Sequence, residues 1–295
     1  ASASTILSGA ITLDELSLDA KNVTFVSSST INDTTDLPGA AIVTTGTLTL
    51  TSGAAIGNLG GGQGLDIDVA TLVVTGTGSG NVTVTEASTL NFGATTVGGI
   101  LTASATTGDI TDTGRLTVGT TSTFKVANGQ NIILDSASNA FTGAVTMQAN
   151  AGSGTFGNIT FVDSAAVRIN SSAAANGDLY IDGGTDDQVG GNLTITATTG
   201  DITDNTNVTV TGNSTFTTLA DAGAITLNNT NAFNGWVKLT TTDSSGNDSH
   251  ATIDNGTTAL ILNTGSVVKG NLTVTSGNVG GITDNGTVTV GGNLV

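Results

Sequence analysis

The side chains that could carry acid–base chemistry in this chain are almost all aspartates. The densest group is Asp182, Asp186 and Asp187, and paired carboxylates can act as general acid and base in polysaccharide cleavage. Such an enzyme also needs cations that hold an anionic substrate. The six Lys and Arg residues are scattered, and none lies close in sequence to this group. We therefore expect no enzymatic activity.

Residues 61–68 resemble the start of the calcium-binding nonapeptide repeat. The Gly and Asp positions fit as far as Asp66, but the eighth place, which should be aliphatic, is Asp68. Sites of this kind also share each ion between tandem copies, and the sequence holds one copy. We interpret the stretch as a Gly-rich turn, with calcium as the alternative. The prediction is that calcium and a chelator give the same melting temperature.

Three further aspartates, Asp112, Asp204 and Asp284, each end an Ile-Thr-Asp sequence. At about four coils apart, roughly 20 Å, they are too distant to share an ion. We expect each to accept hydrogen bonds from nearby backbone amides of its turn. The single histidine, His250, lies in a polar stretch and is expected to be a solvated surface residue.

Two other features could bind a ligand. Trp236 and Lys238 form an aromatic patch that could stack on a sugar, although Phe233 and Val237 beside them favour burial. Thr-x-Thr triplets, such as residues 194–196, are similar to those on ice-binding solenoids. Such a face needs one triplet per coil in strict register, and the triplets here are irregular, so ordinary β-propensity explains them.

The elements that must position these residues recur with a short period. The sequence GNLTIT at Gly191 returns as GNSTFT at Gly212, 21 residues later, and GNL at Gly270 returns at Gly292, 22 residues later. Recurrence at this length is typical of a solenoid, in which each coil buries its apolar face against its neighbours.

Alternating apolar and polar residues predict strands with one buried face. Leu193 and Ile195, and Val208 and Val210 in the next strand, alternate with Thr and Asn. This period of two places the apolar set inside and the threonines outside.

A longer repeat lies over the short one. The sequence GDITD at Gly108 returns at Gly200, 92 residues later, which would be about four coils. Units of about 90 residues could also be tandem immunoglobulin-like sandwiches. The shorter period and the lack of Pro-rich or charged linkers favour an all-β parallel solenoid with coils of about 21–22 residues. We expect irregular strands and a loop in residues 1–39 and solenoid repeats in residues 40–295.

Composition excludes several classes of partner. The net charge is −17, which would repel nucleic acid and anionic membranes. There is no cysteine, and therefore no disulfide or thiolate metal site. Aromatic residues make up 3%, which indicates a thin aliphatic interior. No apolar run reaches 18 residues, so we expect no membrane span.

The repeats from Gly191, with GAITLNNTNAFNG at Gly223, resemble those of large secreted bacterial adhesins, the filamentous-haemagglutinin-like and β-strand-repeat exoproteins. The similarity covers most of residues 95–295. It implies a right-handed parallel β-helix in a surface-anchored or released adhesive fibre. The secretion domain of that family usually carries Asn-Pro-Asn motifs, whereas the lone proline here is Pro38, so the resemblance is to the repeat shaft.

These observations together predict a structural role outside the cell. We expect an extracellular fibre or shaft without a cofactor, with a glycan- or ice-binding module as the alternative. The expected partners are further repeats or other copies, end to end, and host or cell-surface glycans. Residues 286–295 show no helix pattern, proline or charged side chain that would cap a solenoid. Two explanations are open: the chain is cut from a longer solenoid, or its ends pair with neighbouring copies. If the 295-residue chain is the whole mature protein, we expect filaments, which deletion of residues 287–295 should abolish.

Overall fold

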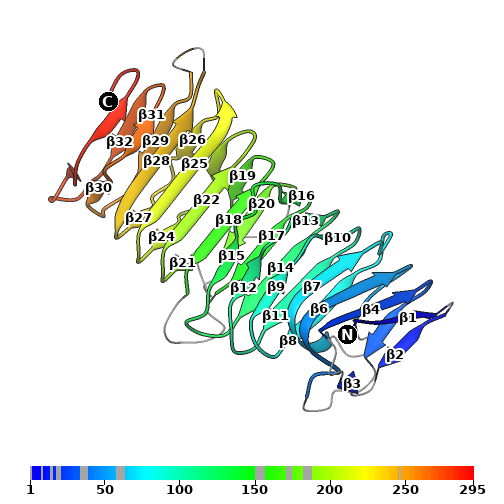
Figure 1. The fold of residues 1–295 in the computed structure, drawn as a ribbon. Helices are drawn as coiled ribbons and strands as arrows, with labels where there is room; N and C mark the ends of the chain where they lie inside the picture. The colour runs from blue at the N-terminus through cyan, green and yellow to red at the C-terminus, as the bar shows by residue number, and fades with distance from the viewer. Residues whose placement is uncertain are drawn as a thin grey trace.

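The computed structural model describes residues 2–7, 9–13, 16–17, 21–33, 39–57, 64–149, 157–170, 175–181, 188–244, 246 and 248–295. The regular structure of these segments is entirely β-strand, without a helix. Figure 1 shows the strands stacked into one elongated body, with the colours in order from the N-terminus at one end to the C-terminus at the other. In the described part, no helix offers a long apolar stretch that could cross a membrane.

The strands are short because turns interrupt the chain every few residues. The first group is β1 (Ser2–Leu7), β2 (Ile11–Leu13), β3 (Leu16–Ser17), β4 (Asn22–Ser27), β5 (Ile31–Asp33), β6 (Ile42–Ser52), β7 (Leu65–Thr75), β8 (Val82–Glu86), β9 (Leu90–Phe92), β10 (Thr95–Val97), β11 (Leu101–Ala105) and β12 (Ile110–Asp112). The second group is β13 (Leu116–Val118), β14 (Ser122–Val126), β15 (Ile132–Leu134), β16 (Ala140–Phe141), β17 (Val145–Gln148), β18 (Ile159–Asp163), β19 (Val167–Ile169), β20 (Asp178–Ile181), β21 (Gln188–Val189), β22 (Leu193–Ala197) and β23 (Ile202–Asp204). The third group is β24 (Thr209–Val210), β25 (Ser214–Asp221), β26 (Ile225–Leu227), β27 (Ala232–Phe233), β28 (Trp236–Thr242), β29 (Ala251–Asp254), β30 (Leu260–Leu262), β31 (Ser266–Val268), β32 (Leu272–Thr275), β33 (Ile282–Asp284) and β34 (Val288–Val290).

Paired strands in the described segments lie parallel, usually one coil apart in the chain. β11 pairs with β14, β22 with β25, and β29 with β32. The residues brought together in successive coils are most often 19 to 27 positions apart, as at Asn192 and Asn213, which are 21 apart. The chain makes about 11 turns. This confirms the predicted parallel β-solenoid and excludes tandem sandwiches, whose strands are antiparallel.

Half of the described strands belong to two long stacks. The first stack runs β8, β11, β14, β17, β20, β19, β23, β26, β29 and β32. The second stack runs β9, β12, β15, β18, β22, β25 and β28. Strands β10, β13 and β16, and later β21, β24 and β27, form two small sheets that close the coils. The strands preceded by Gly-Asn change stack along the chain: β8 and β32 lie in the first stack, and β18, β22 and β25 lie in the second.

The change of stack accompanies one long coil. Asn158 and Asn192 are neighbours although 34 residues separate them. Inside this coil β20 turns back to lie between β17 and β19. An ion pair joins β19 to β20: Nε of Arg168 donates to Oδ1 of the buried Asp178 at 2.6 Å. The strands β12 and β23, which match across the 92-residue repeat, lie in different stacks. The repeat therefore spans fewer coils than the four predicted.

Parallel pairing also runs through the first 39 residues. β1 pairs with β4, β4 with β6, and β2 with β5. The predicted loop around Pro38 lies outside the described residues.

The interior agrees with the alternation in the sequence. Leu193, Ile195, Val208 and Val210 are fully buried, and Thr194 is half-buried on the outward side. The scarce aromatic residues add a column that composition did not predict. Phe92, Phe124, Phe141 and Phe161 follow one another with ring centroids 6.3, 6.0 and 5.4 Å apart. Such edge and tilted contacts favour the interior beyond simple area burial.

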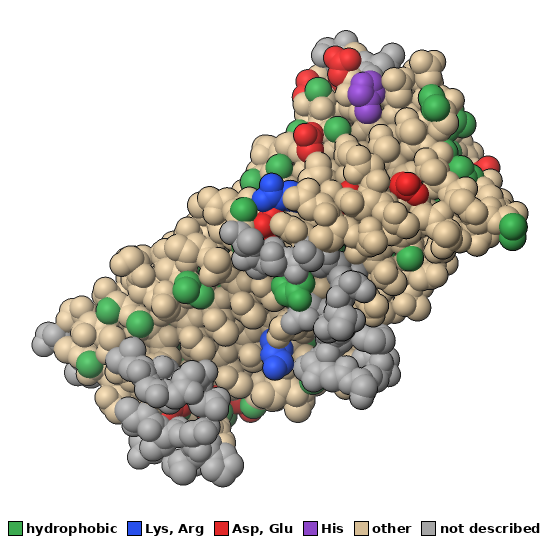
Figure 2. Space-filling model, turned by 180° about the vertical axis from the view of Figure 1, so that it is seen from behind, with side chains coloured by type: hydrophobic (Ala, Val, Ile, Leu, Met, Phe, Trp, Pro, Cys, Tyr) green, Lys and Arg blue, Asp and Glu red, His purple; other side chains and the backbone are tan. Residues whose placement is uncertain are grey.

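The surface is largely uncharged. Figure 2 shows a face made mainly of polar uncharged side chains and backbone, with isolated Lys, Arg, Asp and Glu side chains and singly placed hydrophobic ones. Scattered exposed hydrophobic side chains are normal on soluble surfaces and mark no patch by themselves.

Candidate functional site

An asparagine ladder joins successive coils just before the strands of the second stack begin. The Oδ1 atom of Asn158 accepts the backbone N–H of Asn192 at 2.7 Å, and that of Asn192 accepts the N–H of Asn213 at 2.8 Å. In the preceding coils, Oδ1 of Asn131 accepts the N–H of Asn158 at 2.8 Å, and the backbone N–H of Asn131 donates to Asp109 at 2.6 Å. Each side chain therefore satisfies a backbone donor in the next coil, where the chain turns and the strand ladder is interrupted.

A glycine precedes Asn158, Asn192 and Asn213, although not Asn131, and it makes room for this contact. A Cβ atom at Gly212 would lie 2.5 Å from the carbonyl oxygen of Gly191 and 2.6 Å from Oδ1 of Asn192. Both distances are shorter than real Cβ contacts. The repeated Gly-Asn pair is thus one unit, in which glycine allows the close approach and asparagine supplies the acceptor.

His250 occupies a ladder position in the first stack. Its Nδ1 atom accepts the N–H of Asn271 at 2.9 Å, and Oδ1 of Asn271 accepts the N–H of Asn293 at 2.8 Å. His250 is exposed, as predicted, but it also joins two coils. Sequence reasoning missed this role because no Gly precedes His250; its distance of 21 residues from Asn271 was the available signal.

A buried Asp–Asn pair joins coils at the end of β12. Nδ2 of Asn139 donates to Oδ2 of Asp112 at 2.6 Å, and Oδ1 of Asn139 accepts the N–H of Leu116 at 2.8 Å. The other oxygen of Asp112 accepts the N–H of Asp135 at 2.8 Å. Burial raises the pKa of the Asp112 carboxyl, although these hydrogen bonds oppose that effect.

The same arrangement recurs 92 residues later. Nδ2 of Asn231 donates to Asp204 at 2.7 Å, and its Oδ1 accepts the N–H of Val208 at 2.8 Å. The prediction that these aspartates bond backbone amides is correct. It missed that the amides lie one coil further along the chain and that Asp112 and Asp204 are only 7% and 5% exposed. Asp284 is exposed and bonds the nearby Gly286 N–H at 3.2 Å.

A third recurring position lies at a corner of the coil and is filled by Glu86, Asp163 or Asn255. Each accepts a backbone N–H from the preceding coil, at 3.1 Å from Val69, 3.2 Å from Phe141 and 2.7 Å from Phe233. We call this the corner position. Burial raises the pKa of Glu86 to about 7 and that of Asp163 to about 6, although hydrogen bonds to backbone amides work against it.

The acidic groups singled out from the sequence do not assemble a metal site in the described part of the chain. Asp182, Asp186 and Asp187 lie outside the described residues, as do residues 61–63. Asp66 is half-buried and donates its backbone N–H to Asp33 at 3.4 Å. Asp68 accepts the Ser88 hydroxyl at 3.1 Å. The calcium prediction stays a prediction.

The outward threonines form partial ranks. In the first stack Thr83, Thr102, Thr123 and Thr146 stand in register across four coils. The parallel rank beside them is mixed, and its members are Thr85, Ser104, Lys125 and Gln148. A Thr-x-Thr triplet is therefore not repeated coil after coil in this stack, as an ice-binding face would need.

Trp236 does not lie in the interior. The side chains of β28 alternate, so Val237 points inward while Trp236 and Lys238 point outward and are half-buried. The predicted burial of Trp236 was wrong, because the strand phase is set by Val237 and Leu239, which fill the core.

A shallow groove follows the corner of the first stack across successive coils. Two adjoining hollows of about 320 and 350 Å³ share Thr85 and Thr106. Asp66 lies in one hollow and Lys125 in the other, and Thr85 and Ser104 lie between them in the same rank. The arrangement offers hydroxyl groups flanked by one carboxylate and one ammonium group.

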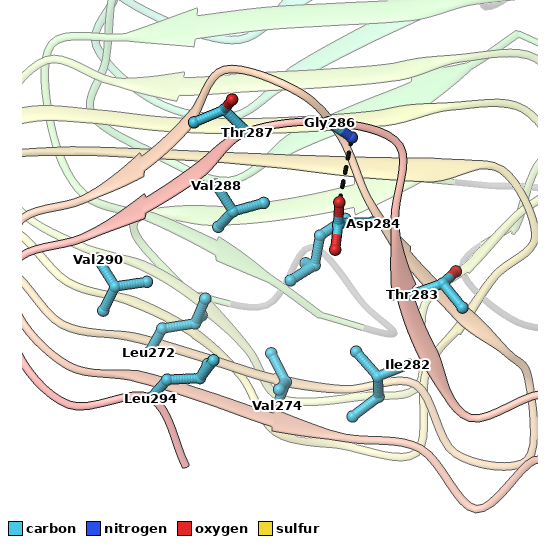
Figure 3. A pocket seen from close by; sticks show the side chains of 11 residues that line it. Leu272, Val274, Ile282, Thr283, Asp284, Gly286, Thr287, Val288, Val290 and Leu294 are labelled. Atoms are coloured by element: carbon cyan, nitrogen blue, oxygen red, sulfur yellow. Dashed lines mark hydrogen bonds between the residues drawn. The ribbon is translucent and has the colours of Figure 1, made fainter.

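A second hollow, of about 480 Å³, lies at the C-terminal coil. Figure 3 shows Leu272, Val274, Val288, Val290 and Leu294 gathered around it. Ile282 beside them is 42% exposed, whereas the matching residues of the earlier repeats, Ile110 and Ile202, are fully buried. These side chains occupy the interior position of a coil, and the hollow is the open end of the apolar core.

The fold and the coil-to-coil hydrogen bonds define a β-solenoid repeat protein. A family model described as "Repeats of unknown function (DUF5649)" matches residues 79–148, 156–240 and 248–295. The matched segments make up more than half of the chain, so the chain belongs to this family. No curated protein and no protein of solved structure matched the chain.

Proposed function

We propose that this chain is a structural shaft of an extracellular fibre, either part of a large bacterial surface adhesin or a self-assembling surface filament. The observation that carries the proposal is the coil-to-coil bonding in the described segments, in which ladder asparagines and buried Asp–Asn pairs join successive turns. Repeats that contact only their neighbours suit a rod of adjustable length.

Other features support a structural role on the cell surface. The chain belongs to a repeat family. The surface is acidic in net charge and largely uncharged in detail, which suits a hydrated fibre. The open apolar core at the C-terminal coil suits end-to-end continuation by more β-structure. The proposal includes no catalytic activity and no cofactor.

Electron microscopy of the purified chain tests this proposal. At about 4.8 Å per coil, about 11 turns give a rod of about 50 Å per chain. Rods of that length, alone or joined end to end, are the expected result. Round particles, or closed side-by-side dimers at every concentration, would contradict a shaft.

The groove favours a second candidate function, the binding of a surface glycan. Hydroxyl groups and one ammonium group suit a short saccharide with a single carboxylate, which would pair with Lys125. The probe is a sialylated trisaccharide, with its neutral parent sugar as the comparison. In a calorimetric titration Lys125→Gln should weaken binding of the sialylated sugar, whereas the control Lys21→Gln should not. Equal affinities for the two sugars, or no binding of either, would remove this candidate.

A further inference from the structure

The corner position holds side chains of different charge in the three matched repeats. Glu86 and Asp163 end the opening strands of the first two repeats, and Asn255 follows that of the third. Their side chains are 0%, 3% and 0% exposed. Each accepts one backbone N–H from the preceding coil. One interior position is thus occupied by a carboxyl group twice and by a neutral amide once.

Asn255 shows which hydrogen bonds this position requires. Its Oδ1 accepts the Phe233 N–H, and its Nδ2 donates to the carbonyl oxygens of Phe233, Thr258 and Ala259 at 3.2, 3.2 and 2.9 Å. The surroundings therefore present both a donor and acceptors. An ionised carboxylate can only accept, whereas a protonated carboxyl accepts and donates, as an amide does.

Around Glu86 the hydrogen count points the same way. The Ser88 hydroxyl lies 3.1 Å from Oε1 of Glu86 and 3.1 Å from Oδ1 of Asp68. One hydroxyl hydrogen cannot serve both carboxylates. Both contacts become hydrogen bonds when a proton on Glu86 is donated to Ser88, which in turn donates to Asp68. Glu86 is the natural site for that proton because it is fully buried and Asp68 is half-buried.

We propose that Glu86 and Asp163 are proton-binding sites that strengthen two coil junctions as the solution becomes mildly acidic. Each takes up one proton from water. The neutral Glu86 carboxyl then donates to Ser88, and the neutral Asp163 carboxyl lies in the place that the Asn255 amide fills 92 residues later. The two acidic repeats would respond to pH, and the repeat that carries Asn255 would not respond through this position.

The direction of the pH effect follows from the raised pKa of each group. The pKa of Asp163 rises from 3.8 to about 6 and that of Glu86 from 4.5 to about 7, with burial as the main cause. In the folded chain they hold protons that the unfolded chain has released. The stabilisation is fully present below the unfolded values and is lost as the pH rises through about 6 for Asp163 and about 7 for Glu86.

Few charged groups face these two positions. Asp68, on β7, meets Glu86 through Ser88, and its negative charge raises the pKa of Glu86 further. The partner of Glu86 on β11 is Ala105. Asp163 meets Phe141 on β16 and Ala197 on β22, neither of which titrates. Asp112 does not contact Asp163 directly. Asn139 lies between them: its side chain donates to Asp112, and its backbone carbonyl oxygen accepts the N–H of Ser164, next to Asp163.

Urea unfolding at several pH values tests the proposal in the full chain. For Asp163 alone, a shift of about two pKa units changes the unfolding equilibrium by up to about a hundredfold between about pH 4 and about pH 8. Glu86→Gln and Asp163→Asn should each be more stable than the natural chain near pH 8, and this advantage should vanish near pH 4. The matched control is Asp248→Asn, at an exposed aspartate, which should keep the pH dependence of the natural chain.

Carboxyl carbon NMR of the natural chain keeps the test independent of any variant. Glu86 and Asp163 should titrate well above the exposed aspartates, and amide exchange at Val69 and Phe141 should slow as the pH falls below about 6, after correction for intrinsic rates. Ordinary titration of both carboxyls, or amide variants whose stability follows the pH in parallel with the natural chain, would overturn the proposal.

Discussion

At the scale of single residues, glycine and asparagine have separate roles wherever a Gly-Asn pair occupies a ladder position. Glycine lets two turns approach, and asparagine supplies an acceptor to the coil above. Neither role depends on conformational freedom at positive φ, since Gly191 and Gly212 do not adopt it. The close approach is the reason for glycine here.

The first prediction concerns Gly212→Ala. The new methyl group would lie within 2.6 Å of two oxygen atoms of the preceding turn, so the turn must move or the ladder bond must break. We expect a loss of about 2 kcal/mol in the free energy of unfolding. The control is Gly9→Ala, because no atom lies within 4 Å of a Cβ there. Equal stabilities of the two variants in urea unfolding would contradict this account.

The second prediction concerns Asn231→Ala. It removes the acceptor for the buried Val208 N–H and one of the donors to the buried Asp204, which keeps its hydrogen bonds from Asn228 and Asn229. We expect a loss of about 2 kcal/mol. Asn234→Ala, at an exposed asparagine that bonds carbonyl oxygens, should cost less than about 1 kcal/mol. Thermal melts of both variants give the comparison.

Residue roles were only partly predictable from the sequence. The pattern indicated that Asp112 and Asp204 bond backbone amides, which is correct. It could not identify the amides, because the partners belong to the next coil and their distance along the chain depends on the length of each turn. The role of His250 was missed because no Gly precedes it.

At the scale of strands, the alternation of side chains decides which changes the fold tolerates. Ile195→Asp would place an unpaired charge in the core and should cost more than about 4 kcal/mol, unfolding at least its own coil. Thr194→Asp, one residue away on the outward side, should cost less than about 1 kcal/mol. Circular dichroism during urea unfolding distinguishes them. Similar losses from both would mean that the inward and outward sides are assigned wrongly.

The short period and the alternation were enough to predict the parallel solenoid. They did not predict the long coil between Asn158 and Asn192, because the strand that it adds, β20, buries Leu179 and Ile181 and leaves Tyr180 half-buried, as the other strands alternate. The ion pair between Arg168 and Asp178 that closes this coil joins residues ten positions apart. Nothing in the local pattern marked them as partners.

At the scale of the whole molecule, a chain that ends at Val295 exposes the apolar core of its last coil, and this surface should govern its association. Ile282→Asp places a charge at the mouth of the hollow. It should raise the protein concentration needed for end-to-end joining at least tenfold. Val279→Asp is the control, because Val279 is fully exposed and lines no part of the hollow. Light scattering over a concentration series measures both. Unchanged association in the Ile282 variant would show that chains join elsewhere.

The long coil also has a consequence for how rods meet side by side. The first stack carries outward threonines on both sides of it, Thr83–Thr146 before and Thr203–Thr273 after. The two ranks are not in line, because Thr146 is level with Tyr180, whereas Thr203 is level with Arg168, the partner of Asp178. A flat neighbour laid along this side meets threonines in one line over only part of the length. Broad sheet-like aggregation is discouraged by geometry, while growth along the axis stays open.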